Sequence, residues 1–177
     1  MSAPQSALAV LAGEAESSVI ARFRDRFDPV AALGMPAHIT VLYPFIPPDS
    51  IAGDVLGRLR GLFASHRVFA FSLREVRRFP GVLYLQPEPA EPFRALTRDV
   101  HAAFPAFPPY GGVHADIVPH LTFAHASSAK DLESIAAEFK AASETCLPLR
   151  VETREVALLD NASGTWRVRE MFELGGD

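Results

Sequence analysis

Two short stretches decide how this chain folds: residues 38–45, HITVLYPF, and residues 120–125, HLTFAH. Each begins with a His-x-Thr tripeptide in an apolar run typical of a β-strand. Side chains alternate between the two faces of a strand, so the histidine and the threonine of each tripeptide point the same way. Six histidines and six threonines placed at random in 177 residues would rarely give this pattern twice. The pair therefore indicates two matched sites.

The two tripeptides carry groups suited to phosphate chemistry. An imidazole can give or take a proton near neutral pH, and a hydroxyl can donate a hydrogen bond to a phosphoryl oxygen. If His38 and Thr40 face His120 and Thr122 across a groove, the four side chains make an acid–base site for cleaving a phosphodiester. The alternatives are structural histidines on strands and the ordinary strand propensity of threonine. Repetition of the whole pattern argues against both.

Composition bounds the class of protein and its partners. Apolar residues make up 49% and charged residues 21%, as in soluble globular proteins, and 177 residues suit one compact domain. A net charge of -4 argues against an extended nucleic-acid surface and favours a small substrate. Cys146 stands alone, so neither a disulfide framework nor a cysteine metal cluster is expected. No apolar stretch has the length of a membrane span and no signal segment is recognisable, so we expect a cytoplasmic protein.

Hydrophobic periodicity and turn residues predict helices alternating with strands. Asp49-Ser50 is expected to cap the second helix. The predicted strands span residues 8–11, 38–43, 69–77, 82–86, 120–125, 149–159 and 166–174, and the predicted helices span about 17–27, 51–65, 92–104 and 130–143.

The order of predicted elements repeats in the two halves of the chain. The His-x-Thr motifs lie 82 positions apart, and Arg74-Glu75-Val76 reappears as Arg154-Glu155-Val156. This indicates an internal duplication. We therefore expect a single domain, residues 1–177, made of two pseudo-symmetric halves of about 1–88 and 89–177 that bring both motifs to one central groove.

Paired motifs at this separation resemble those of the two-histidine (2H) phosphoesterase superfamily, in particular its 2′–5′ RNA ligase-like branch. Supporting segments are the VLYL strand at residues 82–85, the PPYGG loop at 108–112 and the closing strand that holds Trp166, Phe172 and Leu174. The resemblance implies an α+β, bilobal fold of two antiparallel sheets flanked by helices, with a central groove. It also implies metal-independent phosphodiesterase activity on 2′,3′-cyclic phosphates or on related 2′–5′ and cyclic nucleotide phosphodiesters.

The resemblance also implies roles for the motif residues. His38 is the expected proton donor to the leaving oxygen and His120 the base that activates water, although the sequence alone cannot orient the pair. Thr40 and Thr122 would hold the non-bridging phosphate oxygens.

Further candidates for substrate binding lie near the motifs. Tyr43 and Phe45 could stack on a base or belong to the core. Tyr110 and His114 could contact substrate from the loop before the second motif. His125, which follows the second motif, is a further candidate for substrate binding. RNA-processing members often carry an arginine near this point, a difference that speaks against RNA as the natural substrate.

No cofactor or metal is expected. His114, His120 and His125 do not fit a zinc site, because His120 and His125 point to opposite faces of a strand and no carboxylate completes a ligand spacing. The expected partner is a small nucleotide or an RNA terminus, with no membrane and with the protein a monomer. Two alternatives remain: a non-catalytic nucleotide or phosphometabolite binding module, and a phosphoesterase acting on a cyclic phosphate of ADP-ribose.

Overall fold

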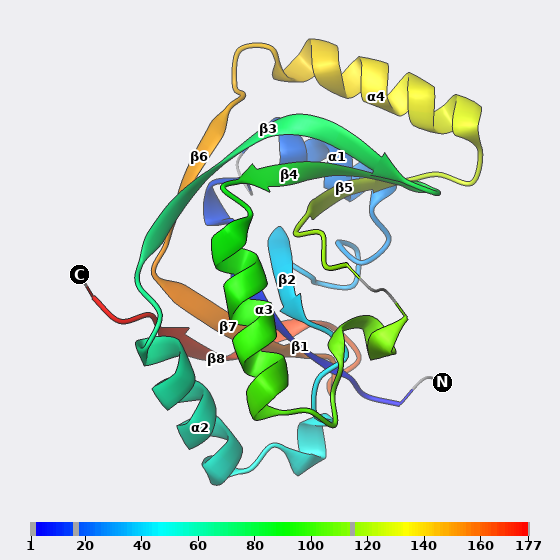
Figure 1. The fold of residues 1–177 in the computed structure, drawn as a ribbon. Helices are drawn as coiled ribbons and strands as arrows, with labels where there is room; N and C mark the ends of the chain where they lie inside the picture. The colour runs from blue at the N-terminus through cyan, green and yellow to red at the C-terminus, as the bar shows by residue number, and fades with distance from the viewer. Residues whose placement is uncertain (1–2, 16–17, 114–115, 177) are drawn as a thin grey trace.

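The computed structural model describes residues 3–15, 18–113 and 116–176, which fold into two four-stranded sheets with helices packed around them (Figure 1). All neighbouring strands in both sheets run antiparallel. The predicted α+β class and the pair of antiparallel sheets are thus confirmed.

The first sheet has the order β2-β1-β7-β8 and the second the order β5-β4-β3-β6. Each sheet takes two strands from either side of residue 88, and each carries a motif strand, β2 or β5, at one edge. The strands of the first sheet are β1 (Ser6–Leu11), β2 (His38–Leu42), β7 (Glu155–Asp160) and β8 (Arg167–Glu173), and those of the second are β3 (Phe69–Phe79), β4 (Val82–Glu88), β5 (Leu121–His125) and β6 (Leu149–Thr153).

Within the residues that the structure describes, four α-helices connect and cover the sheets, and three short 3₁₀ helices lie in the connections. Ser18 and Ser128 cap two of the α-helices by accepting hydrogen bonds from the backbone N–H groups of Ile20 and Asp131. The helices are α1 (Val19–Phe27), α2 (Gly53–Ala64), α3 (Glu91–Ala103) and α4 (Ala129–Ser143), with η1 (Gly13–Ala15), η2 (Pro48–Ser50) and η3 (Pro109–Gly112).

The helix before each motif packs on the motif strand of the other sheet. Helix α1 contacts β5, where Phe23 meets Phe123 edge to face at a ring-centroid distance of 6.3 Å. Helix α3 contacts β2, where the buried Thr97 hydroxyl donates to the Val41 carbonyl at 2.7 Å. The two halves of the chain therefore share one continuous apolar core.

Most predicted boundaries differ from the observed ones by one or two residues, and three differences affect the description of the sheets and the motifs. The strand expected over residues 149–159 is two strands in different sheets, because the chain passes from β6 to β7 at Arg154. Helix α2 begins only at Gly53 after Ala52, because Asp49 and Ser50 belong to η2 instead. His120 lies just before β5 rather than inside it.

Candidate functional site

The two motif strands lie against each other between the sheets. Strands β2 and β5 are edge strands, and they contact one another across the space between the two sheets (Figure 1). His38 is the first residue of β2, and His120 immediately precedes β5. The structure thus brings together the two motif segments that the sequence separates by 82 positions.

The two imidazoles are held by the same hydrogen bond. Nδ1 of His38 lies 2.8 Å from the carbonyl oxygen of Pro36, and Nδ1 of His120 lies 2.7 Å from that of Val118. A carbonyl oxygen can only accept, so each Nδ1 carries the proton. In the neutral ring Nε2 then holds the lone pair, and in both motifs that nitrogen is the one available for proton transfer.

Desolvation lowers the pKa of both rings and so disfavours their charged forms in the free protein. Desolvation lowers the pKa of His38 to about 4, with smaller lowering effects from the Arg24 charge and the His120 ring and opposing effects from Pro36 and Asp28. Desolvation also lowers the pKa of His120, against the effect of its hydrogen bond to Val118. A negatively charged ligand between the rings would favour protonation of either one.

The motif threonines face the same way as their histidines. In the pairing of β1 with β2, Thr40 lies opposite Ala9 and His38 opposite Leu11, so both occupy the same face. Thr122 lies opposite Tyr84, whose ring contacts the His120 ring at a centroid distance of 5.5 Å.

Tyr110 connects the two motifs. A side-chain hydrogen bond joins its hydroxyl to Thr40, while its ring stacks on His120 with centroids 6.4 Å apart. Its backbone N–H donates to the Tyr43 carbonyl at 2.6 Å. Tyr110 has φ 51°, in the left-handed region that a residue with a side chain seldom adopts. Such a conformation persists where surrounding contacts hold it and is common at functional sites.

A cavity of about 380 Å³ opens beside His120. This volume lies within the range of small-molecule pockets. Phe79 stacks on Tyr84 with ring centroids 4.3 Å apart and meets His120 edge to face at 5.2 Å. The lining residues are Phe79, Pro80, Tyr110, Asp116, Val118 and His120.

Three of the candidate substrate-binding residues lie elsewhere. The Tyr43 hydroxyl donates to Gln5 Oε1 at 2.8 Å, and Phe45 is buried among other aromatic rings of the core. His125 Nε2 lies 3.6 Å from Asp28 Oδ1, at the C-terminal end of α1. The structure brings only Tyr110 of this set to the His120 cavity, and His114 lies outside the described residues.

Sequence reasoning did not single out Phe79, Tyr84 or Asp116. Phe79 and Tyr84 sit on either side of the turn between β3 and β4, and an alternating aromatic pattern in a hairpin fits a core strand equally well. The register of β4 with β5 places Tyr84 opposite Thr122, and Phe79 stacks on Tyr84. These tertiary contacts, which the sequence does not show, put both rings beside the second motif.

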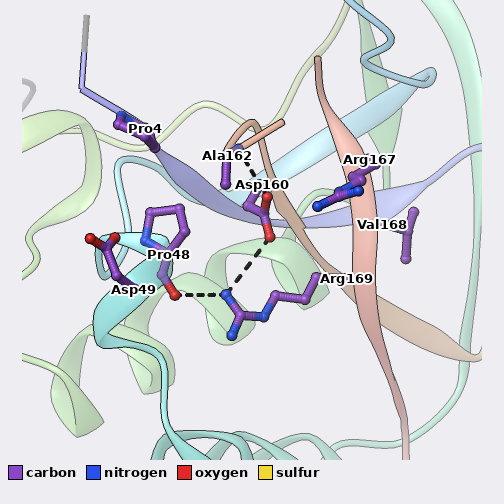
Figure 2. Close-up of a pocket in the computed structure, with 8 residues that line it drawn as sticks. All are labelled: Pro4, Pro48, Asp49, Asp160, Ala162, Arg167, Val168 and Arg169. Atoms are coloured by element: carbon purple, nitrogen blue, oxygen red, sulfur yellow. Dashed lines mark hydrogen bonds and ion pairs between the residues drawn. The ribbon is translucent and has the colours of Figure 1, made fainter. Parts of the chain in front are cut away.

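A second cavity, of about 630 Å³, lies beside β7, β8 and η2 (Figure 2), and no motif residue lines it. There Arg169 donates to the Pro48 carbonyl at 2.7 Å and lies 3.8 Å from Asp160. Nowhere in the described part of the chain do three or more His, Cys, Asp or Glu side chains gather in a group that could hold a metal ion. None of its described helices is long and apolar enough to cross a membrane.

A model of the 2′-5′ RNA ligase superfamily matches residues 11–165, a span that includes both motifs. The chain belongs to the 2′-5′ RNA ligase superfamily. This membership confirms the resemblance seen in the sequence and supports a phosphoesterase-type activity. No curated protein matches the chain.

Solved structures of the superfamily's fold agree along nearly the whole length of this chain. TT0787 of Thermus thermophilus has a TM-score of 0.62 at 18% identity, covering 98% of this chain and 99% of its own. E. coli LigT complexed with 3′-AMP has a TM-score of 0.62 at 17% identity, covering 97% and 98%. E. coli LigT complexed with NADP+ has a TM-score of 0.60 at 19% identity, covering 98% and 99%. At these identities the likeness establishes the fold alone.

Proposed function

We propose that this protein hydrolyses 2′,3′-cyclic phosphates, or related 2′–5′ and cyclic nucleotide phosphodiesters, by general acid–base catalysis with two histidines and no metal. The observation that carries the proposal is the matched arrangement of His38 and His120. Each ring has its Nδ1 proton committed to a backbone carbonyl, and each leaves Nε2 for proton transfer.

The reaction needs the two rings in opposite protonation states. A neutral imidazole takes a proton from water as the water oxygen bonds to phosphorus. The bond from phosphorus to one ribose oxygen breaks, and the protonated imidazole gives that oxygen its proton. Each transfer contributes roughly 10²- to 10⁴-fold in rate.

In the superfamily resemblance His38 is the acid and His120 the base. Burial lowers the pKa of His38 to about 4, so as acid it depends on the anionic phosphate to stabilise its imidazolium. Thr40 and Thr122 would donate to the non-bridging oxygens, where negative charge grows in the transition state.

The cavity beside His120 is the proposed place for the base of the nucleotide. Phe79 and Tyr110 offer ring surfaces for stacking, whereas Tyr43 and Phe45 are engaged elsewhere. LigT has been solved with 3′-AMP, ATP and NADP+, ligands of the same chemical class. A small nucleotide or an RNA terminus is the proposed substrate, and a monomer in the cytoplasm is the proposed state of the protein.

The test is an assay of a panel of 2′,3′-cyclic nucleotides, 2′–5′ dinucleotides and ADP-ribose cyclic phosphate with excess chelator. Wild type should be active with chelator, and His38→Ala and His120→Ala should each lose roughly 100-fold or more, on the order expected for one proton transfer. His66→Ala is the matched control, because His66 pairs with Asp99 away from both motifs.

Activity that disappears with chelator, or that survives both motif substitutions, would refute the mechanism. Tight nucleotide binding without turnover across the panel would favour the binding-module alternative instead.

A further inference from the structure

An arginine on α1 holds the segment that leads into the first motif. Arg24 Nη2 donates to the carbonyl oxygen of Met35 at 2.7 Å, and the Arg24 side chain is almost fully buried. Met35 lies three residues before His38 and next to Pro36, the residue whose carbonyl accepts the His38 Nδ1 proton.

An arginine on α3 makes the corresponding contact in the second motif. Arg94 Nε donates to the carbonyl oxygen of Ile117 at 3.3 Å. Ile117 lies three residues before His120 and next to Val118, whose carbonyl accepts the His120 Nδ1 proton. In each motif, the preceding helix thus supplies an arginine that donates to the backbone carbonyl three residues before the histidine.

The position of this carbonyl explains why the contact matters. Successive carbonyls of an extended segment point in opposite directions. In the first motif the Met35 and Ala37 carbonyls are held by Arg24 and by the Ala12 N–H, which leaves the Pro36 carbonyl between them to face His38. Fixing the carbonyl three residues before the histidine therefore fixes the acceptor that orients the ring.

We propose that Arg24 and Arg94 are equivalent positioning residues, each fixing the backbone segment whose carbonyl orients the histidine of its own motif. Helix α1 also packs on β5 and α3 on β2, so each helix contacts both motif segments. The proposal rests on the proposed function only for its catalytic consequence, because the ring orientation itself can be measured without substrate.

The two arginines, Arg24 and Arg94, differ in their surroundings. Arg24 forms a buried ion pair with Asp28 at 3.1 Å, and Asp28 also lies 3.6 Å from His125 Nε2 on β5. The other charged groups at this end of α1 are Asp25 and Arg26, which line the cavity beside His125. The Arg94 side chain is 44% exposed and lies 3.8 Å from Glu91. The Arg24 contact should therefore be rigid and electrostatically coupled to His38. The Arg94 contact should be weaker, and Arg94 should tolerate substitution better.

The first experiment removes the guanidinium of the exposed Arg94, because this substitution is expected to disturb folding less than one at Arg24. Arg94→Met should lower kcat roughly 10-fold, with little change in KM. This is the low end of the range for a hydrogen bond that orients a catalytic side chain without touching substrate. Arg94→Lys should restore part of the loss, because an ammonium can also donate to the Ile117 carbonyl. Arg98→Met is the matched control: Arg98 is on the same helix, and its described ion pairs are with Glu91 and Asp99 only.

The second experiment changes the charges of the buried Arg24–Asp28 ion pair. The Arg24 charge lowers the pKa of His38 and the Asp28 charge raises it. Asp28→Asn should shift the His38 titration to lower pH, and Arg24→Gln should shift it to higher pH. Opposite shifts from the two partners are not expected from a general loss of packing. Circular dichroism confirms that each variant is folded, and Arg94→Met keeps the test decisive if Arg24→Gln is not.

A readout without substrate separates this proposal from the proposed function. Nitrogen-15 NMR of the histidine rings should show Nδ1-protonated His38 and His120 in wild type and mixed tautomers for His120 in Arg94→Met. If the tautomers and kcat are unchanged in Arg94→Met, the positioning role is refuted even in an active enzyme. If wild type is inactive on every substrate but the tautomers shift, the proposed function fails and the positioning role stands.

Discussion

Tyr110, in the loop before the second motif, shares a side-chain hydrogen bond with Thr40, in the middle of the first. The same ring stacks on His120, so one residue touches both halves of the site. The left-handed backbone of Tyr110 is followed by two glycines, Gly111 and Gly112, that also have positive φ. The loop therefore holds this ring between His120 and Thr40.

Removing the Tyr110 hydroxyl and removing its ring should have different effects. Tyr110→Phe keeps the stacking surface and frees Thr40, so we expect a loss in kcat of a fewfold, near that of one neutral hydrogen bond of about 1 kcal/mol. Tyr110→Ala also removes a wall of the cavity and should raise KM for nucleotide substrates. Steady-state kinetics of both variants test this, and equal effects of the two would contradict it.

The motif threonines should be needed for the chemical step. Valine has nearly the shape of threonine but no hydroxyl, so Thr40→Val and Thr122→Val remove one donor each. We expect roughly 10²-fold losses in kcat, as for donors to a developing oxyanion, with smaller changes in KM. Thr165→Val, an exposed threonine in the loop before β8, is the control. A change confined to KM would show that the hydroxyls bind substrate without stabilising the transition state.

The dependence of activity on pH should reflect the lowered pKa values of both histidines. One ring must be protonated and the other neutral, so kcat/KM should be bell-shaped. Its maximum should lie on the acid side of pH 6.5, because the pKa of His38 is lowered to about 4 and that of His120 is also lowered. The profile of kcat should lie at higher pH, since bound phosphate stabilises the imidazolium. An optimum of kcat/KM above pH 7.5 would contradict this.

Folding stability should fall as the solution becomes acidic. Between pH 6.5 and about 4 the unfolded chain binds a proton at His38 that the folded chain does not bind, so stability rises with pH across this window. Urea titrations of wild type and His38→Gln from pH 4 to 8 measure the effect. The variant should show a shallower dependence on pH, and parallel curves would contradict the lowered pKa of His38.

The loop before the first motif contains a glycine that should not tolerate a side chain. Gly34 has φ 87°, and a Cβ there would lie 2.7 Å from the Trp166 carbonyl oxygen. We expect Gly34→Ala to destabilise the protein by about 1–3 kcal/mol. Gly57→Ala is the matched control, because Gly57 is inside α2 with open space around it and alanine should stabilise a helix by up to about 1 kcal/mol there. Thermal or urea unfolding of both variants measures the difference.

The motif strands could be predicted because their chemistry and their periodicity coincide. The alternation that buries Ile39 and Val41 in β2 also sends His38 and Thr40 to the other face, so one pattern predicted both the strand and the candidate site residues on it. Tyr43 and Phe45 were candidates because they come directly after the first motif strand. The sequence did not show that Tyr43 would hydrogen-bond to Gln5 or that Phe45 would be part of the core.

The features that the sequence did not reveal depend on tertiary contacts. The sequence from Leu149 to Leu159 shows no turn residue at Arg154, yet the chain passes there from β6 of one sheet to β7 of the other. Arg24 and Arg94 act on backbone carbonyls, and any residue provides a carbonyl, so no pattern in the sequence marks their targets.

The exchange of strands between the two halves bears on how the protein unfolds. Because neither residues 1–88 nor residues 89–177 contain all the strands of either sheet, neither half can lose its structure without opening both sheets. The molecule should therefore unfold as one cooperative unit. The spacing between the two imidazoles then persists for as long as the native state itself.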